Sequence, residues 1–202
     1  MSKEKNIRKI ILEKARELFL KEGFHKTSMR TIAKAAGIST WPLYTNFKNK
    51  SEVFIAICVE GYDYLIESIN KIVENEDSAP SHLKQIFYVY KDFYYNMPQY
   101  SQLIRLALNP LSGISLPDEL QKKIFEKELE IQKIKEKIIS DGIKKGEIRD
   151  LDVKSFALFM NFVASGILQV NDSGMIKHLG ISNDEITEQM LNFVRYVMIK
   201  SV

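Results

Sequence analysis

The sequence predicts an all-α protein of about nine helices, with a three-helix N-terminal domain over residues 1–48 and a larger helical domain over residues 49–202. Three observations support this fold class. Apolar residues recur at the three- and four-residue spacing of an amphipathic helix along almost the whole chain. Segments rich in glycine, proline, asparagine and serine separate these periodic stretches. No stretch combines two-residue alternation with β-branched enrichment, so we expect no sheet.

The first two predicted helices begin the N-terminal domain. The first spans residues 6–22 and ends at Gly23. Its apolar face contains Ile7, Ile11, Ala15, Leu18 and Phe19. Ser28 is a good N-cap for the second helix, which ends at Gly37. Its inward residues are Ile32, Ala33 and Ala36. Two short helices separated by Gly37 predict a helix-turn-helix over residues 28–47, whose second helix would lie in the major groove of DNA.

The third predicted helix, which ends at about Phe47, has two different sides. At about 100° per residue, Leu43 and Phe47 fall about 40° apart and form the side that faces the core. Trp41 and Thr45 fall roughly opposite. We therefore expect Trp41 to face outward and to contact a partner. The alternative is that its ring folds back onto a neighbouring helix.

Pro42 does not exclude this helix, because the N–H groups of a first helical turn have no intrahelical acceptor. If Ser39 is the N-cap, Pro42 is the third helical residue, and if Thr40 is the N-cap, it is the second. Ser39 cannot accept from the missing N–H of Pro42 and would have to use that of Trp41. Proline also biases Trp41 away from helical dihedral angles, so we expect a distorted first turn or a late start.

The remaining helices follow from caps and breaks. Asn49 starts a fourth helix, because Asn49 and Glu52 have capping-box spacing, and this helix runs to about Val73. Ser182 and Glu185 repeat that spacing before the last helix. The later helices are predicted at residues 80–96, 98–109, 118–145, 152–171 and 183–200.

Composition limits the class of protein. The chain has 202 residues, of which 45% are hydrophobic and 27% are charged, enough for an ordinary globular core. Its one cysteine, Cys58, excludes an intrachain disulfide, and we interpret it as a small buried residue. The N-terminus lacks the apolar region of a signal peptide, and the longest apolar stretch, 156–168, is too short to span a membrane. We expect a cytoplasmic protein without a membrane partner.

Charge is unevenly distributed along the chain. Residues 1–50 contain 12 Lys and Arg against 4 Asp and Glu, whereas residues 51–202 contain 17 against 22. A basic domain on an acidic body indicates that the basic part binds a polyanion. The alternative is that short helices carry lysines for solubility.

A run of residues in the N-terminal part has the order and spacing of a known family. These residues are Ala15, Leu18, Phe19, Gly23, Phe24, Thr27, Ser28, Ile32, Ala33, Ala36, Gly37, Ile38, Ser39, Leu43, Tyr44, Phe47, Lys50 and Glu52. Residues 8–54 thereby resemble, without a gap, the tetracycline-repressor (TetR) family of bacterial transcription regulators. The resemblance implies a homodimer on a palindromic double-stranded DNA operator, usually as a repressor. It also implies a C-terminal ligand pocket whose occupancy releases the DNA.

The resemblance carries roles in DNA contact onto positions of this chain. Ser28 and Arg30 match the start of the family's first DNA helix. Tyr44 matches a tyrosine that commonly contacts phosphate, and Lys50 matches a lysine at the start of the fourth helix. The matched recognition-helix positions are Thr40, Trp41, Pro42, Tyr44, Thr45 and Asn46.

The chemistry of these residues agrees with DNA contact. Lys48 and Lys50 supply positive charge for phosphates, and the first turn of a helix at Lys50 already favours an anion. Arg30 suits either a guanine or a phosphate. Trp41 and Pro42 depart from the family, which often has a small residue at the first of these positions. Neither forms bidentate base contacts, so readout depends on apolar contact, Arg30 and DNA shape, and the operator sequence stays open.

Two helices of the larger domain are candidates for dimerisation. Residues 152–171 are apolar nearly all round, and residues 183–200 have a broad apolar face. The resemblance implies that both helices pair with their copies in a four-helix bundle. The alternative is that both are core of a single chain.

A segment dense in aromatic residues is the candidate for ligand binding. Residues 87–100 contain seven aromatics in 14 positions. With residues of other helices, the predicted effector set is Tyr62, Phe87, Tyr90, Tyr94, Met97, Phe125, Met160 and Asn161. The alternative is that these aromatics are plain core. Asn161 either bonds a polar group in the pocket or pairs at the dimer interface. No cluster of one charge is present, so we expect an apolar or weakly polar effector.

Nothing in the sequence indicates catalysis. His25, His82 and His178 have no His or Cys partner at metal-ligand spacing. Phosphate-binding, dinucleotide and hydrolase motifs are also missing from the sequence, so we expect no catalytic residue, metal or cofactor. Two alternatives to a ligand-controlled regulator stay open: a DNA-binding adaptor controlled by a protein partner, and a helical enzyme.

Overall fold

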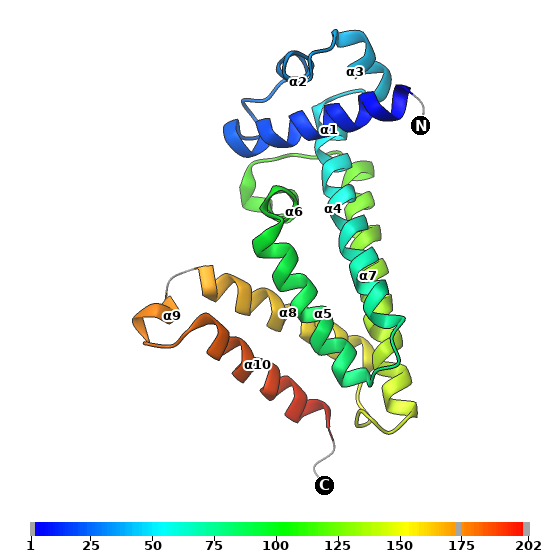
Figure 1. Ribbon diagram of the computed structural model, residues 1–202, viewed down its shortest axis with the longest axis vertical. Helices are drawn as coiled ribbons and strands as arrows, with labels where there is room; N and C mark the ends of the chain where they lie inside the picture. Colours follow the sequence, from blue (N-terminus) through cyan, green and yellow to red (C-terminus); the bar gives the residue numbers. More distant parts are fainter. Residues whose placement is uncertain (1–2, 173–174, 200–202) are drawn as a thin grey trace. The chain divides into compact units, whose positions relative to one another are not determined.

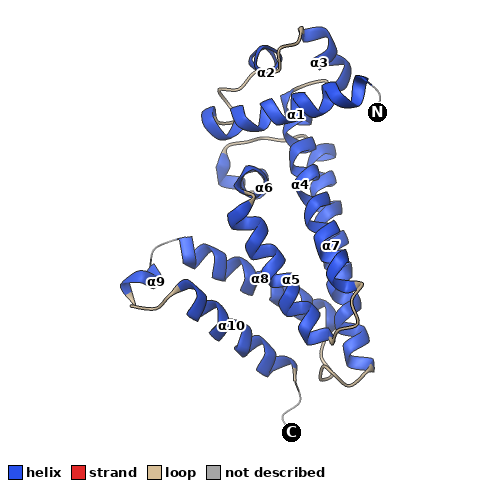
Figure 2. Cartoon of the chain, in the orientation of Figure 1, coloured by secondary structure: helices blue, strands red, loops and turns tan. Residues whose placement is uncertain are grey.

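The computed structural model describes residues 3–172 and 175–199, and this part of the chain consists of helices and loops without a strand (Figure 1, Figure 2). The helices are α1 (Lys3–Glu22), α2 (Met29–Ala35), α3 (Thr40–Asn46), α4 (Lys50–Val73), α5 (Ala79–Asn96), α6 (Pro98–Leu108), the 3-10 helix η1 (Pro110–Ser112), α7 (Asp118–Lys144), α8 (Val153–Asp172), α9 (Met175–His178) and α10 (Asn183–Met198). The described residues form nine α-helices longer than four residues and no strand. The predicted all-α class with about nine helices is therefore confirmed. The sequence did not predict the four-residue α9, and residue 200 of the last predicted helix lies outside the described residues.

Local caps explain where the N-terminal helices begin and end. The Ser28 hydroxyl accepts from the Thr31 N–H at 3.1 Å, and the Thr31 hydroxyl accepts from the Ser28 N–H at 2.9 Å. This reciprocal pair confirms Ser28 as the N-cap of α2. Gly23 and Gly37 follow α1 and α2 with φ of +82° and +66°, a conformation that glycine adopts without strain.

The start of α4 differs in one detail from the predicted capping box. The Asn49 side chain accepts from the Glu52 N–H at 3.0 Å, as predicted. The Glu52 carboxylate, however, accepts from the N–H of Lys48 at 2.7 Å, one residue before the cap. The turn between α3 and α4 is therefore closed by two side-chain bonds, and α4 begins at Lys50.

The chain packs as two compact units, and each has its own core. The first contains Met1–Tyr64 and Tyr95–Glu128, and the second contains Leu65–Tyr94 and Leu129–Val202. In the first unit, the rings of Phe19, Phe24 and Phe54 pack against one another with centroids 5.1–5.7 Å apart. In the second, the buried residues Phe87, Ile167 and Leu191 form a cluster. Because these units describe packing and not activity, the functional division into residues 1–48 and 49–202 stays a prediction.

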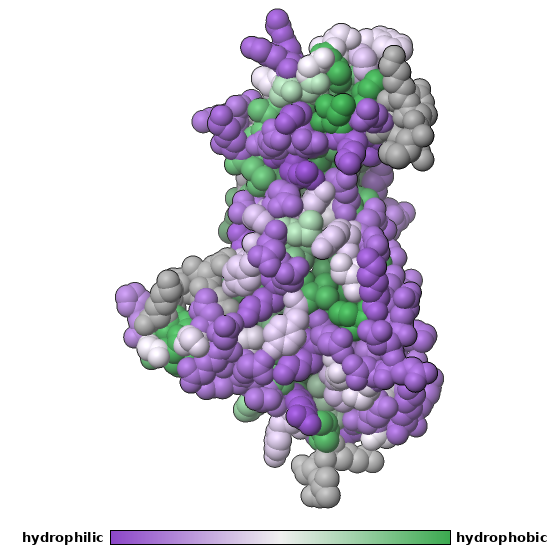
Figure 3. All heavy atoms as spheres, in the orientation of Figure 1, coloured by the Kyte–Doolittle hydropathy of each residue, from purple (hydrophilic) through white to green (hydrophobic). Residues whose placement is uncertain are grey.

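Cys58 is fully buried in α4, as the sequence predicted. Burial raises the pKa of its thiol to about 12. No helix in the described part of the chain is long and apolar enough to cross a membrane. Hydrophilic residues cover most of the face seen in Figure 3, where apolar residues form smaller patches.

Candidate nucleic-acid interface and effector cavity

The short helix α3 presents one buried side and one exposed side. Leu43 and Phe47 are 0% and 4% exposed, whereas Trp41 and Tyr44 are 76% and 55% exposed. The outward orientation predicted for Trp41 is therefore confirmed, and its ring does not fold back into the core. Arg8 of α1 lies over the Phe47 ring, 5.0 Å from its centroid, and this contact was not predicted.

Pro42 does not delay the start of α3, which begins at Thr40. Ser39 is the N-cap of α3, with extended backbone (φ −69°, ψ 166°), so Pro42 is the third helical residue. The Ser39 side chain makes no capping bond in the described structure: Pro42 has no N–H to donate, and Ser39 does not bond the Trp41 N–H either. Of the two predicted arrangements, the one with Ser39 as the N-cap is confirmed.

The last two polar side chains of α3 bond to their own helix. The Thr45 hydroxyl donates to the Trp41 carbonyl at 2.9 Å. The Asn46 amide donates to the Pro42 carbonyl at 2.8 Å. These bonds orient the Thr45 methyl group and the Asn46 side chain, and they leave Trp41 and Tyr44 as the largest exposed surfaces of α3.

The basic and polar residues predicted around α3 differ in their surroundings. Ser28, Arg30, Thr40 and Lys48 are exposed, so a partner can reach them. Lys50 is half-buried, and its ammonium donates to the carbonyls of Phe24, His25 and Thr27 at 2.8, 3.3 and 3.1 Å. Its predicted position in the first turn of α4 is confirmed. Its contact with phosphate stays a prediction.

The predicted effector set is divided between the two units. Tyr62, Met97 and Phe125 belong to the first, and the second holds Phe87, Tyr90, Tyr94, Met160 and Asn161. Tyr62 is buried and its hydroxyl donates to the Glu128 carboxylate, whereas Phe125 is more than half exposed. Phe87 lies in the apolar cluster of the second unit.

Asn161 belongs to a small polar group inside the second unit. Its amide oxygen accepts from the ammonium of the buried Lys135, and its amide nitrogen donates to Gln132 at 3.1 Å. The same ammonium lies 5.7 Å from the centroid of the Tyr90 ring. Asn161 of α8 thus pairs with α7 of its own chain, an arrangement that the sequence did not predict.

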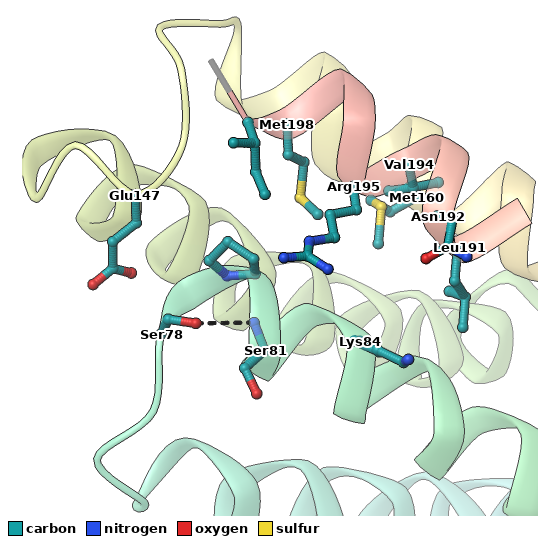
Figure 4. Close-up of a pocket in the computed structure, with 12 residues that line it drawn as sticks. Ser78, Ser81, Lys84, Glu147, Met160, Leu191, Asn192, Val194, Arg195 and Met198 are labelled. Atoms are coloured by element: carbon teal, nitrogen blue, oxygen red, sulfur yellow. Dashed lines mark hydrogen bonds between the residues drawn. The ribbon is translucent and has the colours of Figure 1, made fainter. Parts of the chain in front are cut away.

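A cavity of about 400 Å³ lies in the second unit, against α5, α8 and α10 (Figure 4). Its described lining residues are Ser78, Pro80, Ser81, Lys84, Glu147, Met160, Leu191, Asn192, Val194, Arg195, Met198 and Ile199. Met160 is the member of the predicted effector set among them. The side chain of Arg195 extends from α10 toward the first turn of α5 (Figure 4). At that turn, the Glu147 carboxylate accepts from the Ala79 N–H at 2.7 Å. The cavity therefore combines an apolar wall with two cationic side chains, Lys84 and Arg195.

Ion pairs and hydrogen bonds connect α5 and α10 beside this cavity. Glu188 accepts from the Tyr88 hydroxyl and from Lys84, the latter at 3.2 Å, and these bonds lower the pKa of its carboxyl. Burial and the neighbouring Glu188 raise the pKa of Tyr88 to about 12. Lys91 bonds Asp184 at 2.7 Å and lowers the pKa of that carboxyl. The sequence did not predict Lys84 and Arg195 as effector-binding residues, because single charged residues on a helix surface usually serve solubility.

Metal ligands do not gather in the described residues. No group of three or more His, Cys, Asp or Glu side chains within them could hold a metal ion. His82 is buried, and its Nε2 atom lies 3.1 Å from the Asn75 carbonyl oxygen. This hydrogen bond satisfies the buried ring nitrogen.

Comparisons with known proteins agree with the geometry of α2 and α3. The model of a family described as bacterial regulatory proteins, tetR family, matches residues 11–57. The fatty acid metabolism regulator protein of Bacillus subtilis (strain 168) is 29% identical over 145 residues, which cover 71% of this chain and 72% of that protein.

Two solved structures share the fold. The transcriptional regulator FadR from Bacillus subtilis, in complex with stearoyl-CoA, has a TM-score of 0.74 at 22% identity and covers 94% of this chain and 98% of that one. AibR, in complex with isovaleryl coenzyme A and operator DNA, has a TM-score of 0.63 at 22% identity and covers 81% of this chain and 85% of that one. The helix-turn-helix and the family match identify residues 11–57 as a DNA-binding domain of the TetR family, and together with the curated relative they make the chain a DNA-binding transcriptional regulator.

Proposed function

We propose that this regulator is a repressor that binds a palindromic operator as a homodimer and leaves it when a small effector binds. The observation that carries the proposal is the division of α3 into a buried side, with Leu43 and Phe47, and an exposed side, with Trp41 and Tyr44. A recognition helix must be held from behind while its front stays accessible to the major groove. The basic N-terminal part of the chain supports the same role.

The proposed DNA contacts follow the exposed residues. Trp41 and Pro42 offer apolar surface to thymine methyl groups and to the sugar edge, and Tyr44 offers a hydroxyl to phosphate. Ser28, Arg30, Thr40 and Lys48 contribute polar and phosphate contacts. Thr45 presents its methyl group, because its hydroxyl is bonded within α3.

The proposed dimer uses the outward faces of α8 and α10. Large exposed apolar residues lie there at helical spacing: Leu158, Phe159, Phe162, Met190, Phe193 and Tyr196. An exposed apolar surface of this kind is typical of a protein interface. Two copies supply the two recognition helices that a palindrome requires.

The proposed effector is an acyl thioester of coenzyme A, which is more strongly anionic than the apolar or weakly polar effector expected from the sequence. The name of the Bacillus subtilis relative and the acyl-CoA ligands of the two structures support this class. The cavity in the second unit supports it as well, since Leu191, Val194 and Met198 offer apolar contact and Lys84 and Arg195 offer charge for an anionic group. Met160 belongs both to this cavity and to the predicted effector set, so the cavity is the first place to test.

The experiment has two stages. First, an operator is selected with the wild-type protein from a library of random-sequence DNA duplexes, and we expect a palindromic consensus. Second, release from that operator is measured with acyl-CoAs of short, medium and long chains, with free coenzyme A as control. We expect an acyl-CoA to release the DNA, and Lys84→Gln with Arg195→Gln to weaken that release. Lys133→Gln, an exposed lysine of α7, is the matched control.

Each stage has an outcome that contradicts the proposal. Recovery of no preferred sequence would exclude sequence-specific operator binding. An operator without release or thermal stabilisation by any acyl-CoA would reject the effector class, and it would favour an adaptor that responds to a protein partner.

A further inference from the structure

The ammonium of Lys50, the first residue of α4, is surrounded by the turn that joins α1 to α2. It donates to the carbonyls of Phe24, His25 and Thr27 at 2.8, 3.3 and 3.1 Å. It also lies 4.4 Å from the centroid of the Phe24 ring. An ammonium has three N–H donors, and here three carbonyl acceptors surround them.

The turn that Lys50 holds leads directly into the DNA-binding helices. Within it, the Thr27 N–H and hydroxyl both donate to the Gly23 carbonyl, at 3.3 and 2.8 Å, and Thr27 is buried. The next residue is Ser28, whose hydroxyl caps α2. Lys50 therefore bonds the carbonyl immediately before the N-cap of α2, and it does so from the first turn of α4.

This geometry differs from that of a phosphate-binding lysine. A lysine that binds the DNA backbone extends to the surface with its donors free, as the exposed Lys48 does. The donors of Lys50 point inward to three carbonyls of one turn. A planar guanidinium directs its N–H groups into one plane, so arginine would not reproduce this arrangement.

We infer that Lys50 is a positioning residue for DNA binding, which fixes the α1–α2 turn to the first turn of α4 and so sets the orientation of α2. The inference rests on the proposed function, because its consequence is measured as operator binding. In this inference Lys50 does not contact a phosphate directly. Its ammonium holds the α1–α2 turn in place, and Ser28 and Arg30 contact the DNA.

The test compares four proteins on the selected operator: wild type, Lys50→Ala, Lys50→Arg and the matched control Lys48→Ala. Affinity is measured as a function of salt concentration, since each lost phosphate contact flattens the log–log slope by about 0.9. We expect Lys48→Ala to flatten the slope by that amount. We expect Lys50→Ala and Lys50→Arg to weaken binding about tenfold or more while retaining the wild-type slope.

A second measurement uses the protein alone and does not depend on the operator. Hydrogen exchange of the backbone amides of residues 24–31 is expected to accelerate in both Lys50 variants and to stay unchanged in Lys48→Ala. If Lys50→Ala does not fold, Lys50→Met keeps the aliphatic stem over the Phe24 ring and removes only the donors.

Three results would overturn the inference: a slope flattened by about 0.9 in Lys50→Ala, wild-type affinity in Lys50→Arg, or unchanged exchange of residues 24–31 in the Lys50 variants. Failure of the wild-type protein to select an operator would instead contradict the proposed function. The exchange measurement would still decide whether Lys50 holds the turn.

Discussion

The guanidinium of Arg16, in α1, donates a 2.5 Å hydrogen bond to the hydroxyl of Tyr100, in α6, and lies 4.7 Å from the centroid of the same ring. Glu60 of α4 approaches this guanidinium to 3.6 Å. Burial raises the pKa of Tyr100, and so does the nearby Glu60. One arginine of the DNA-binding part of the chain thus joins two helices that follow it in the sequence.

Tyr100→Phe tests how much the junction formed by Arg16, Glu60 and Tyr100 contributes to stability. The change removes the hydroxyl and leaves the ring under Arg16, so we expect the free energy of unfolding to fall by about 1 kcal/mol. Urea unfolding monitored by circular dichroism measures the effect. Tyr44→Phe is the control, because the Tyr44 ring is exposed and its change should leave stability unaltered. Equal stability of both variants would show that the Arg16 bond contributes nothing.

Gly61→Ala tests the packing of the same junction. A Cβ atom on Gly61 would lie 2.8 Å from the Cβ of Tyr100, so α6 must shift away from α4. We expect a loss of about 1–3 kcal/mol in the free energy of unfolding, because overpacking forces such shifts. An unchanged or raised melting temperature would mean that the contact relaxes without strain.

Trp41→Ala separates DNA binding from folding. Trp41 is exposed, so we expect the melting temperature to change little and operator affinity to fall at least tenfold. Leu43→Ala, two residues away on the buried side of α3, should instead cost about 2–5 kcal/mol of stability. A large drop in the melting temperature of Trp41→Ala would contradict its proposed role as a contact.

Phe193→Ser tests the proposed dimer. Phe193 is 68% exposed on α10, and burying it between two copies would make a serine there costly. We expect the variant to sediment as a monomer at concentrations where the wild-type protein is a dimer. Leu129→Ser on α7 is the matched control, since Leu129 is also exposed but lies on neither proposed interface helix. If both variants sediment as the wild type does, the interface lies elsewhere.

The contacts between α5 and α10 predict a loss of stability in acid. Hydrogen bonds lower the pKa values of Glu188 and Asp184 in the folded protein. Their contribution is present above the unfolded-state pKa, about 4, and is lost as pH falls through the lower folded-state values. Thermal unfolding of wild type and Glu188→Gln from neutral to acidic pH measures this. We expect the variant to be less stable at neutral pH and less sensitive to acid, with Glu185→Gln as control.

The elements that the sequence predicted well are those with local causes. The cap at Ser28, the glycines after α1 and α2 and the inward phase of Leu43 and Phe47 depend on neighbouring residues, so spacing alone reveals them. The prediction that Trp41 faces outward followed from the same phase. The start of α4 was also predicted, although the Glu52 carboxylate bonds one residue earlier than a capping box requires.

What sequence could not reveal depends on contacts between distant segments. The carbonyls around Lys50 come from residues more than 20 positions away, and backbone carbonyls carry no signature in a sequence. Asn161 looked like an interruption of an apolar run, but it pairs with Lys135 on another helix. The cavity is lined by Lys84 and Arg195, two unremarkable surface charges in sequence that only packing brings to one place.

The burial of Cys58 makes this protein convenient for spectroscopy. The chain has one cysteine, and because the thiolate is the reactive form, a buried thiol with a pKa of about 12 stays inert to maleimides at neutral pH. Thr40→Cys at the exposed start of α3 would therefore accept a spin label without removal of the native residue. Pulsed dipolar measurements on the labelled protein would then report the distance between two recognition helices, which neighbouring major grooves on one side of the duplex set at about 34 Å.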